Sequence, residues 1–140
     1  MKKTILVVVL SLLGGFLLIQ FVPYRVSNPP VRSEPKWDSP RTRQLAVAAC
    51  FDCHSNEVQT PWYGKVAPVS WLVTNHVNDG RAALNFSEWN GRGGGDASET
   101  IREGSMPPSY FTWFGLHSNA KLTKAERDEL ARGLDASLRP

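Results

Sequence analysis

Two cysteines and a histidine stand close together in the segment Cys50-Phe51-Asp52-Cys53-His54. This is the C-x-x-C-H spacing by which c-type haem is attached. Residues three apart on a helical turn lie on one face, so both thiols can reach the two vinyl groups along one edge of a porphyrin. The next residue then directs its imidazole at the iron as the proximal ligand. The motif predicts one haem c, bound covalently through Cys50 and Cys53 and ligated by His54.

Three other uses of these residues remain as alternatives. A thioredoxin-like C-x-x-C follows a strand within a βαβ pattern, and no such pattern surrounds the motif. A zinc site could add His76 or His117, although structural zinc sites seldom take ligands from adjacent residues. A disulfide would close a short loop and gain little entropy. The five-residue pattern is more specific than any of these, so haem attachment is the leading hypothesis.

The far side of the iron calls for a second, distal ligand, and the candidates are Met106, His76 and His117. Met106 is the only methionine besides Met1, and two prolines follow it and stiffen the loop. A lone methionine is ordinarily core filler, but this setting is not helical and favours a ligand loop. We predict Met106 as the distal ligand, with the two histidines or an open position as alternatives.

The chain begins with a long apolar segment that follows Met1-Lys2-Lys3 and runs from Thr4 to Val22. As a helix it would rise about 28 Å, enough to cross a hydrocarbon core of about 30 Å. A cleaved signal peptide has a shorter apolar region that ends in small residues of the Ala-x-Ala kind, and no such site follows here. The sequence therefore predicts an uncleaved membrane anchor over residues 1–22, with a removed signal as the alternative.

The positive charges that flank this segment are too evenly balanced to decide its orientation. Covalent haem attachment takes place outside the cytoplasm, so the motif and the export segment agree. Together they predict a single-pass inner-membrane protein whose N-terminus lies inside and whose haem domain lies on the periplasmic, outer face.

Between the anchor and the motif lies a proline-rich stretch. Five of the ten prolines fall between Pro23 and Pro40, and such a composition favours polyproline II. At about 3.1 Å per residue, the stretch would be a semi-rigid spacer that holds the domain up to roughly 50 Å from the membrane. The predicted division is an anchor at 1–22, a linker at 23–39 and a haem domain at 40–140.

Helical signals dominate the haem domain, and no strand is predicted. Asp38 or Ser39 can cap a helix that starts at Pro40 and leads into the cysteines. Further elements are expected over 68–77 (ended by Gly80), over 82–89, and from Asp96 or Ser98 to 103 (ended by Gly104). A capping box at Thr123-Lys124-Ala125-Glu126 opens a last helix with leucines at i, i+4 spacing. The fold class is all-α, and the first and last helices match the plan of a class I cytochrome c, in which they pack together.

Charge and aromatic content restrict the function further. Residues 1–36 hold five of the sixteen Lys and Arg but one of the thirteen acidic residues, so the positive charge belongs to the N-terminal segment and not to the domain. This excludes the basic face that nucleic-acid binding needs. Eleven of the fourteen aromatic residues fall between Trp37 and Phe114, and they are expected to form a core around the porphyrin. Arg81 and Arg92 could pair with haem propionates, although exposed arginines are more usual.

Four stretches of the sequence resemble the haem-binding domain family of small membrane-anchored monohaem c-type cytochromes. They are CFDCHSN at 50–56, PWYGKVAPVSWLV at 61–73, HVNDGRAALNFSEW at 76–89 and GSMPP at 104–108. The likeness covers nearly all of the chain after Trp37. It implies thioethers at Cys50 and Cys53, His54 as proximal ligand, and Met106 near the distal face.

The function expected from these features is single-electron transfer between redox partner proteins of a respiratory or periplasmic chain. A haem with both axial positions filled has no place for a substrate, so an electron carrier rather than an enzyme is predicted. The alternative is a haem-based sensor or a peroxidase-like enzyme, which would need an open or labile distal site. The distal ligand discriminates between the two.

Overall fold

The computed structural model describes residues 1–139, and over that range the chain is helical and contains no strand. An isolated parallel bridge joins Ser33 to Glu88. The α-helices are α1 (Lys2–Ile19), α2 (Pro40–Ala49), α3 (Phe51–His54), α4 (Val69–Ala83), α5 (Ala97–Glu103) and α6 (Lys124–Leu138). Three 3-10 helices complete the fold: η1 (Trp62–Lys65), η2 (Ser109–Gly115) and η3 (Ser118–Ala120). The predicted all-α class is confirmed.

Helices α2 and α6 begin at the caps that the sequence indicates. The Ser39 hydroxyl accepts a hydrogen bond from the Thr42 amide, and Pro40 occupies the first turn of α2. At α6 the Thr123 hydroxyl and the Glu126 side chain each accept a bond from the other residue's amide. Such side-chain caps satisfy amides that a helix leaves free at its start.

The first and last helices of the domain cross closely, as expected for a class I cytochrome c plan. Gly133 of α6 makes this approach possible, because a Cβ there would lie 2.1 Å from the Thr42 hydroxyl of α2. Helix α5 packs against α6 beside them. The core that these helices enclose consists of Leu45, Ala46, Ala49, Phe51, Leu84, Phe86, Ile101, Leu130, Ala131, Leu134 and Leu138.

Helix α4 is longer than the sequence predicts, since it continues to Ala83 rather than ending at Gly80. The expected helical element over 82–89 is therefore wrong: its first residues close α4 and the rest is irregular. Gly80 lies inside the helix, where its missing side chain lets α4 approach the segment at Cys53. The sequence alone does not distinguish a glycine that allows two segments to pack closely from a glycine that ends a helix.

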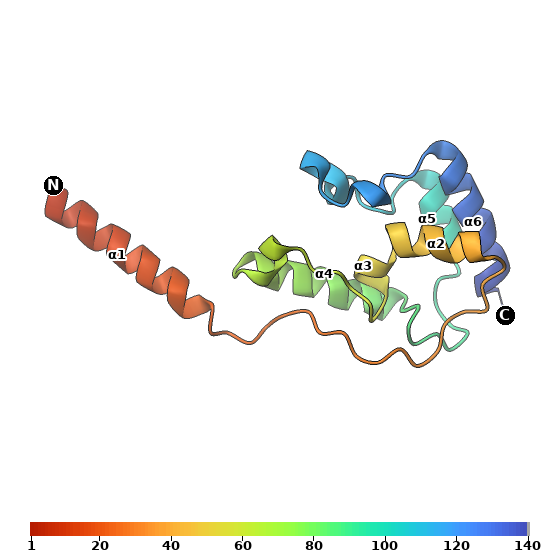
Figure 1. The fold of residues 1–140 in the computed structure, drawn as a ribbon, viewed down its shortest axis with the longest axis horizontal. Coiled ribbons are helices and arrows are strands. Elements are labelled where there is room, and N and C mark those ends of the chain that lie inside the picture. Colours follow the sequence, from red (N-terminus) through yellow and green to blue (C-terminus); the bar gives the residue numbers. More distant parts are fainter. Residues whose placement is uncertain (140) are drawn as a thin grey trace.

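The segment from Gln20 to Lys36, which we call the strap, lies along the domain instead of standing away from it (Figure 1). The Gln20 side chain bonds both backbone groups of Ala67, at 2.9 and 3.1 Å. The Tyr24 hydroxyl donates to Asn75 of α4 at 2.5 Å.

Farther along the strap, backbone groups make the contacts. The amide of Arg32 donates to Ser87 O at 2.9 Å, and the Trp89 amide donates to Ser33 O at 3.0 Å. Near the end of the strap, Glu34 accepts two hydrogen bonds from the Arg43 guanidinium, at 2.7 and 2.8 Å. The expected spacer of roughly 50 Å is therefore wrong. The prolines lack donors, but the residues between them supply enough polar groups to hold the strap down.

Helix α1 projects away from the domain, and none of its residues is buried. It is long and apolar enough to cross a membrane. Its last turn leads directly into the first contact of the strap, at Gln20.

Candidate functional site

The C-x-x-C-H segment forms a tight helical turn where α2 ends. Cys50 lies between the two helices, and its carbonyl accepts hydrogen bonds from the amides of Cys53 and His54, at 3.0 and 2.9 Å. The two thiols and the imidazole are thereby held on one short turn, as the sequence predicts. Both cysteines are free thiols, so the disulfide alternative gains no support.

Phe51, inside the motif, anchors this turn in the core. Its ring stacks on Phe86, with centroids 5.6 Å apart, and lies 6.3 Å from Trp37. Phe51 is 3% exposed and Phe86 1%. The apolar ring fixes the turn in the core, and Cys50 packs against the same cluster.

The imidazole of His54 is oriented by a backbone carbonyl. Its Nδ1 lies 3.0 Å from Leu84 O, just beyond the end of α4. A carbonyl oxygen only accepts hydrogen bonds, so Nδ1 carries the proton and Nε2 keeps a free lone pair. A metal-binding histidine is typically held in this way. Sequence reasoning missed the partner, because a carbonyl carries no signal in the residue type.

Helix α4 supports the turn from its other side. A Cβ at Gly80 would lie 2.5 Å from the carbonyl oxygen of Cys53, so the two segments meet backbone to backbone. The next residue, Arg81, donates to Ser55 O at 2.8 Å and to Ser27 O of the strap at 2.9 Å. Arg81 thus joins the strap to the segment after the motif. Arg92, the other arginine considered for haem propionates, is exposed in the glycine-rich loop.

Both thiols are protonated at neutral pH. Burial raises the pKa of the Cys50 thiol to about 12, with a smaller contribution from Cys53. Burial and the nearby Asp52 carboxylate raise the pKa of Cys53 to about 11. Within residues 1–139 no group of three or more His, Cys, Asp or Glu is placed to hold a metal ion.

His117, a candidate distal ligand, is engaged elsewhere. Its Nδ1 lies 3.2 Å from the Asp52 carboxylate, and its Nε2 lies 3.1 Å from the Tyr63 hydroxyl. Its ring also stacks on Phe111 at 3.9 Å. With both nitrogens occupied, His117 fastens the segment between η2 and η3 to the motif and does not offer a lone pair to an iron.

The other two candidates remain accessible. Met106 lies between α5 and η2 and is 39% exposed. His76 is exposed on α4, where its ring lies 6.0 Å from Tyr110 of η2. Met106 as the distal ligand stays a prediction.

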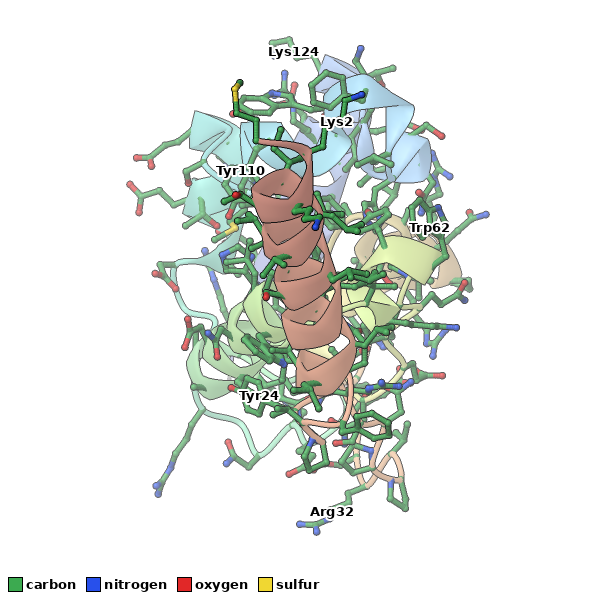
Figure 2. All side chains as sticks on the ribbon, turned by 90° about the vertical axis from the view of Figure 1, so that its left-hand side faces the viewer. Lys2, Tyr24, Arg32, Trp62, Tyr110 and Lys124 are labelled. Carbon is green, nitrogen blue, oxygen red and sulfur yellow. The ribbon has the colours of Figure 1, made fainter. Side chains whose placement is uncertain are left out.

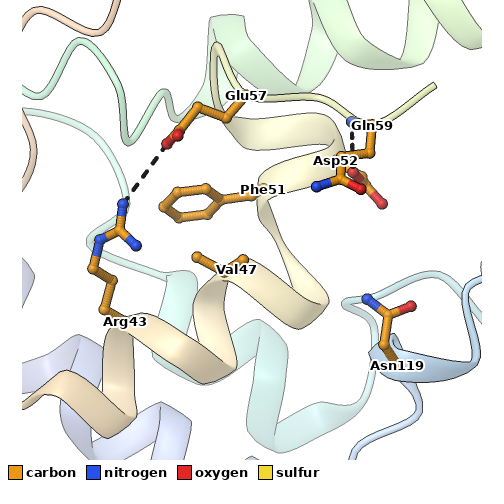
Figure 3. Close-up of a pocket in the computed structure, with 7 residues that line it drawn as sticks. All are labelled: Arg43, Val47, Phe51, Asp52, Glu57, Gln59 and Asn119. Atoms are coloured by element: carbon orange, nitrogen blue, oxygen red, sulfur yellow. Dashed lines mark hydrogen bonds and ion pairs between the residues drawn. The ribbon is translucent and has the colours of Figure 1, made fainter.

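The side chains in the middle of the motif also line a small cavity of about 180 Å³ (Figure 3). Phe51 and Asp52 face it, together with Arg43, Val47, Glu57, Gln59 and Asn119. Neither cysteine nor His54 lines it. It is also smaller than typical ligand pockets, which run from about 300 Å³ upward. The cavity therefore lies apart from the side chains that could hold a haem.

Several aromatic side chains expected in the core are exposed instead, namely Trp62, Tyr110, Trp113 and Phe114, and the apolar side chains of Leu72 and Leu116 are exposed as well. They lie on η1, α4, η2 and the residue that follows η2. The structure thus has apolar surface on these elements for a large hydrophobic group, and a helical turn that presents two thiols and an oriented imidazole. This donor set fits a covalently bound haem.

Comparison with known proteins indicates haem binding as well. A family model described as a haem-binding domain matches residues 14–136, which is nearly the whole chain. We found no match among curated proteins or among solved structures. The match begins inside α1 and includes the strap, the motif and most of α6.

Proposed function

Because the chain belongs to the haem-binding domain family, we propose that it is a membrane-anchored c-type cytochrome that transfers single electrons. One haem is attached through Cys50 and Cys53, with His54 as its proximal ligand. The domain lies on the periplasmic, outer face of the membrane, and α1 is the anchor. Its partners are redox proteins of a respiratory or periplasmic chain.

The observation that carries this proposal is the contact between His54 and the Leu84 carbonyl. A hydrogen bond at Nδ1 sets the tautomer and the ring orientation, and so leaves Nε2 as the ligand atom. The residue thus oriented is the histidine of a C-x-x-C-H turn, and both thiols of that turn are free. The haem iron, when bound, supplies a one-electron redox couple.

Electron transfer rather than catalysis is supported by the contacts of the polar side chains near the motif, which leave His117 without a free nitrogen. A peroxidase-like site needs distal groups that can move protons. One candidate for such a group, His117, is held by Asp52 and Tyr63. Met106 is the ligand we propose for the distal position, because it is exposed and free of that network. An iron closed on both sides exchanges electrons and binds no substrate.

Covalent attachment is tested most directly by denaturing electrophoresis. The protein, produced with a haem-ligation system, should keep its haem stain after boiling, because thioether bonds survive where coordination does not. The single variants Cys50→Ala and Cys53→Ala should each weaken the stain, and the double variant should remove it. Haem that migrates free from the wild-type chain would overturn the proposal of a c-type cytochrome.

A further inference from the structure

The exposure of side chains along α4 is the reverse of what a helix on the surface of a domain usually shows. Ser70 and Thr74, which are polar, are buried together with Val77. Val69 and Leu72, which are apolar, are 42% and 57% exposed. A surface helix ordinarily turns its apolar stripe to the core and its polar residues to solvent. Two apolar side chains of α4 therefore face a space that residues 1–139 do not fill.

This exposed face of α4 leads directly to the haem motif. Leu72, His76 and Gly80 follow one another at intervals of four residues, so they lie on one stripe of the helix. Val69 comes seven residues before His76 and lies on the same face. Gly80 ends the stripe at the motif, because a Cβ there would lie 3.1 Å from the Cβ of Cys53. We call Val69, Leu72 and His76 the α4 wall. A group bonded to the Cys53 thiol therefore begins where this wall ends.

The α4 wall turns toward η2 and away from the strap. The His76 ring lies 6.0 Å from the ring of Tyr110 in η2. The strap contacts another side of α4, where the Tyr24 hydroxyl donates to Asn75 and accepts a hydrogen bond from Asn78. Figure 1 shows η2 above α4 and the strap below it, and Figure 2 shows Tyr110 above Tyr24 in the same way. The wall thus lies on the side of α4 that the strap leaves uncovered.

We propose that the porphyrin lies along the α4 wall, between α4 and η2. This inference rests on the proposed haem attachment and deepens it, because it names the surface that holds the macrocycle. From Leu72 to Gly80 the stripe extends about 12 Å along the helix axis, which is long enough to cover a porphyrin ring. Contact between this apolar surface and the macrocycle removes both from water, which stabilises the bound state. His76 belongs to the wall as a contact residue, and Met106 remains the proposed distal ligand.

Unfolding of the full-length, haem-loaded protein in detergent tests the α4 wall. Leu72→Ala is compared with Val31→Ala, because Val31 is also apolar and is 45% exposed but lies in the strap. Alanine is the best helix former, so helix propensity gives no reason for Leu72→Ala to destabilise α4. If the Leu72 side chain is buried against the porphyrin, the equilibrium constant for unfolding should rise about tenfold or more in that variant. Val31→Ala should stay close to wild type. Denaturant titration followed by the haem absorbance measures both constants.

Methyl NMR spectra of the reduced, haem-loaded protein give a second readout, which does not depend on stability. The ring current of a porphyrin moves the signals of methyl groups that lie over its face upfield. The methyl signals of Val69 and Leu72 should therefore be shifted upfield, whereas those of Val31 should not. Each signal is assigned by its loss in the variant Val69→Ala, Leu72→Ala or Val31→Ala.

The outcomes separate the α4 wall from the proposed function. If the chain carries its haem but the signals of Val69 and Leu72 are not shifted, the wall is wrong whatever the unfolding constants are, and the cytochrome still stands. Upfield signals from Val31 would place the porphyrin on the side of the strap and would overturn the wall as well. A chain that attaches no haem would overturn the proposed function, and the wall with it.

Discussion

The carbonyl oxygen of Cys53 lies 2.5 Å from the point where a Cβ at Gly80 would stand. This contact holds α4 against the haem motif and places Leu84 O, four residues later, against His54. The close approach therefore gives a glycine in mid-helix a role in orienting the proposed iron ligand.

Gly80→Ala should destabilise the protein, although replacing a glycine inside a helix by alanine usually stabilises it. Alanine normally stabilises a helix interior by roughly 0.5–1 kcal/mol. Here the added methyl meets the backbone of Cys53, so we expect a loss of about 1–3 kcal/mol in the free energy of unfolding. The yield of attached haem should fall as well. Denaturant unfolding and the haem absorbance per chain measure both effects.

Gly95→Ala is the matched control, because nothing lies within 4 Å of the Cβ it adds. Its free energy of unfolding and its haem yield should stay close to those of the wild type. A Gly80→Ala variant that is more stable than wild type, with full haem loading, would contradict the close packing of α4 on the motif.

Met106→Ala should open the distal side of the haem. Loss of the thioether ligand is expected to lower the reduction potential by on the order of 100 mV, within the roughly 0.8 V range that axial ligands span. The variant should bind carbon monoxide when reduced, and the weak ferric iron–sulfur band should disappear. Redox titration and absorbance spectroscopy measure these changes.

His76→Ala and His117→Ala serve as comparisons for the distal ligand. Both should keep the wild-type spectrum of the iron, although His117→Ala should loosen the segment that Asp52 and Tyr63 hold. If the wild type already binds carbon monoxide rapidly, the distal position is open. The sensor or peroxidase-like function would then replace electron transfer.

Gln20→Ala should release the first contact of the strap. The Ala67 amide donates to the Gln20 side chain at 2.9 Å, and a net loss of about 1 kcal/mol corresponds to roughly fivefold faster opening. Hydrogen exchange of the Ala67 amide should accelerate by that factor. Gln59→Ala, which changes an exposed glutamine, should leave it unchanged. Equal exchange in the two variants would mean that Gln20 does not hold the domain.

The far end of the strap should loosen in acid. Hydrogen bonds from Arg43, and a weaker one from Trp37, lower the pKa of the Glu34 carboxylate below its ordinary value of 4.5. A lowered pKa means that the ionised group stabilises the fold. This stabilisation is complete above pH 4.5 and is lost as the pH falls through the pKa of the folded state.

Thermal unfolding at a series of pH values tests this dependence. Glu34→Gln should be less stable than wild type at pH 7 by about 1 kcal/mol, and the two should converge in acid. Glu103→Gln, at an exposed glutamate, should run parallel to wild type. If the difference between wild type and Glu34→Gln were the same at pH 3 and pH 7, the charge on Glu34 would not be the cause.

Local signals in the sequence predicted most of the fold, and long-range contacts account for the rest. Ser39 and Thr123 cap helices because a cap needs only residues within one turn. The C-terminal end of α4 depends instead on what Gly80 meets across the chain, and no local pattern reveals that. The strap was misjudged for the same reason, since its partners at Ala67 and Trp89 lie far along the sequence.

The candidate site divides in the same way. Cys50, Cys53 and His54 are recognisable from spacing alone, because one helical turn sets their geometry. The partners of His117 could not be read from the sequence: its neighbours Asp52 and Tyr63 belong to distant segments, and a histidine that could ligate iron looks the same as one that fastens a loop. The Leu84 carbonyl has no signature in the residue type at all.

The span of the strap's contacts also orders events when the chain is delivered across a membrane from its N-terminal side. Gln20 must wait for Ala67, 47 residues later, and Ser33 for Trp89, 56 residues later. The cysteine motif is complete at residue 54, before any of these partners has emerged. In the proposed c-type cytochrome, the haem-ligation machinery would thus meet the thiols on an open chain, before the strap can close over the domain. The order of the segments along the chain would therefore leave the two thiols exposed for a short time, in which haem could be attached.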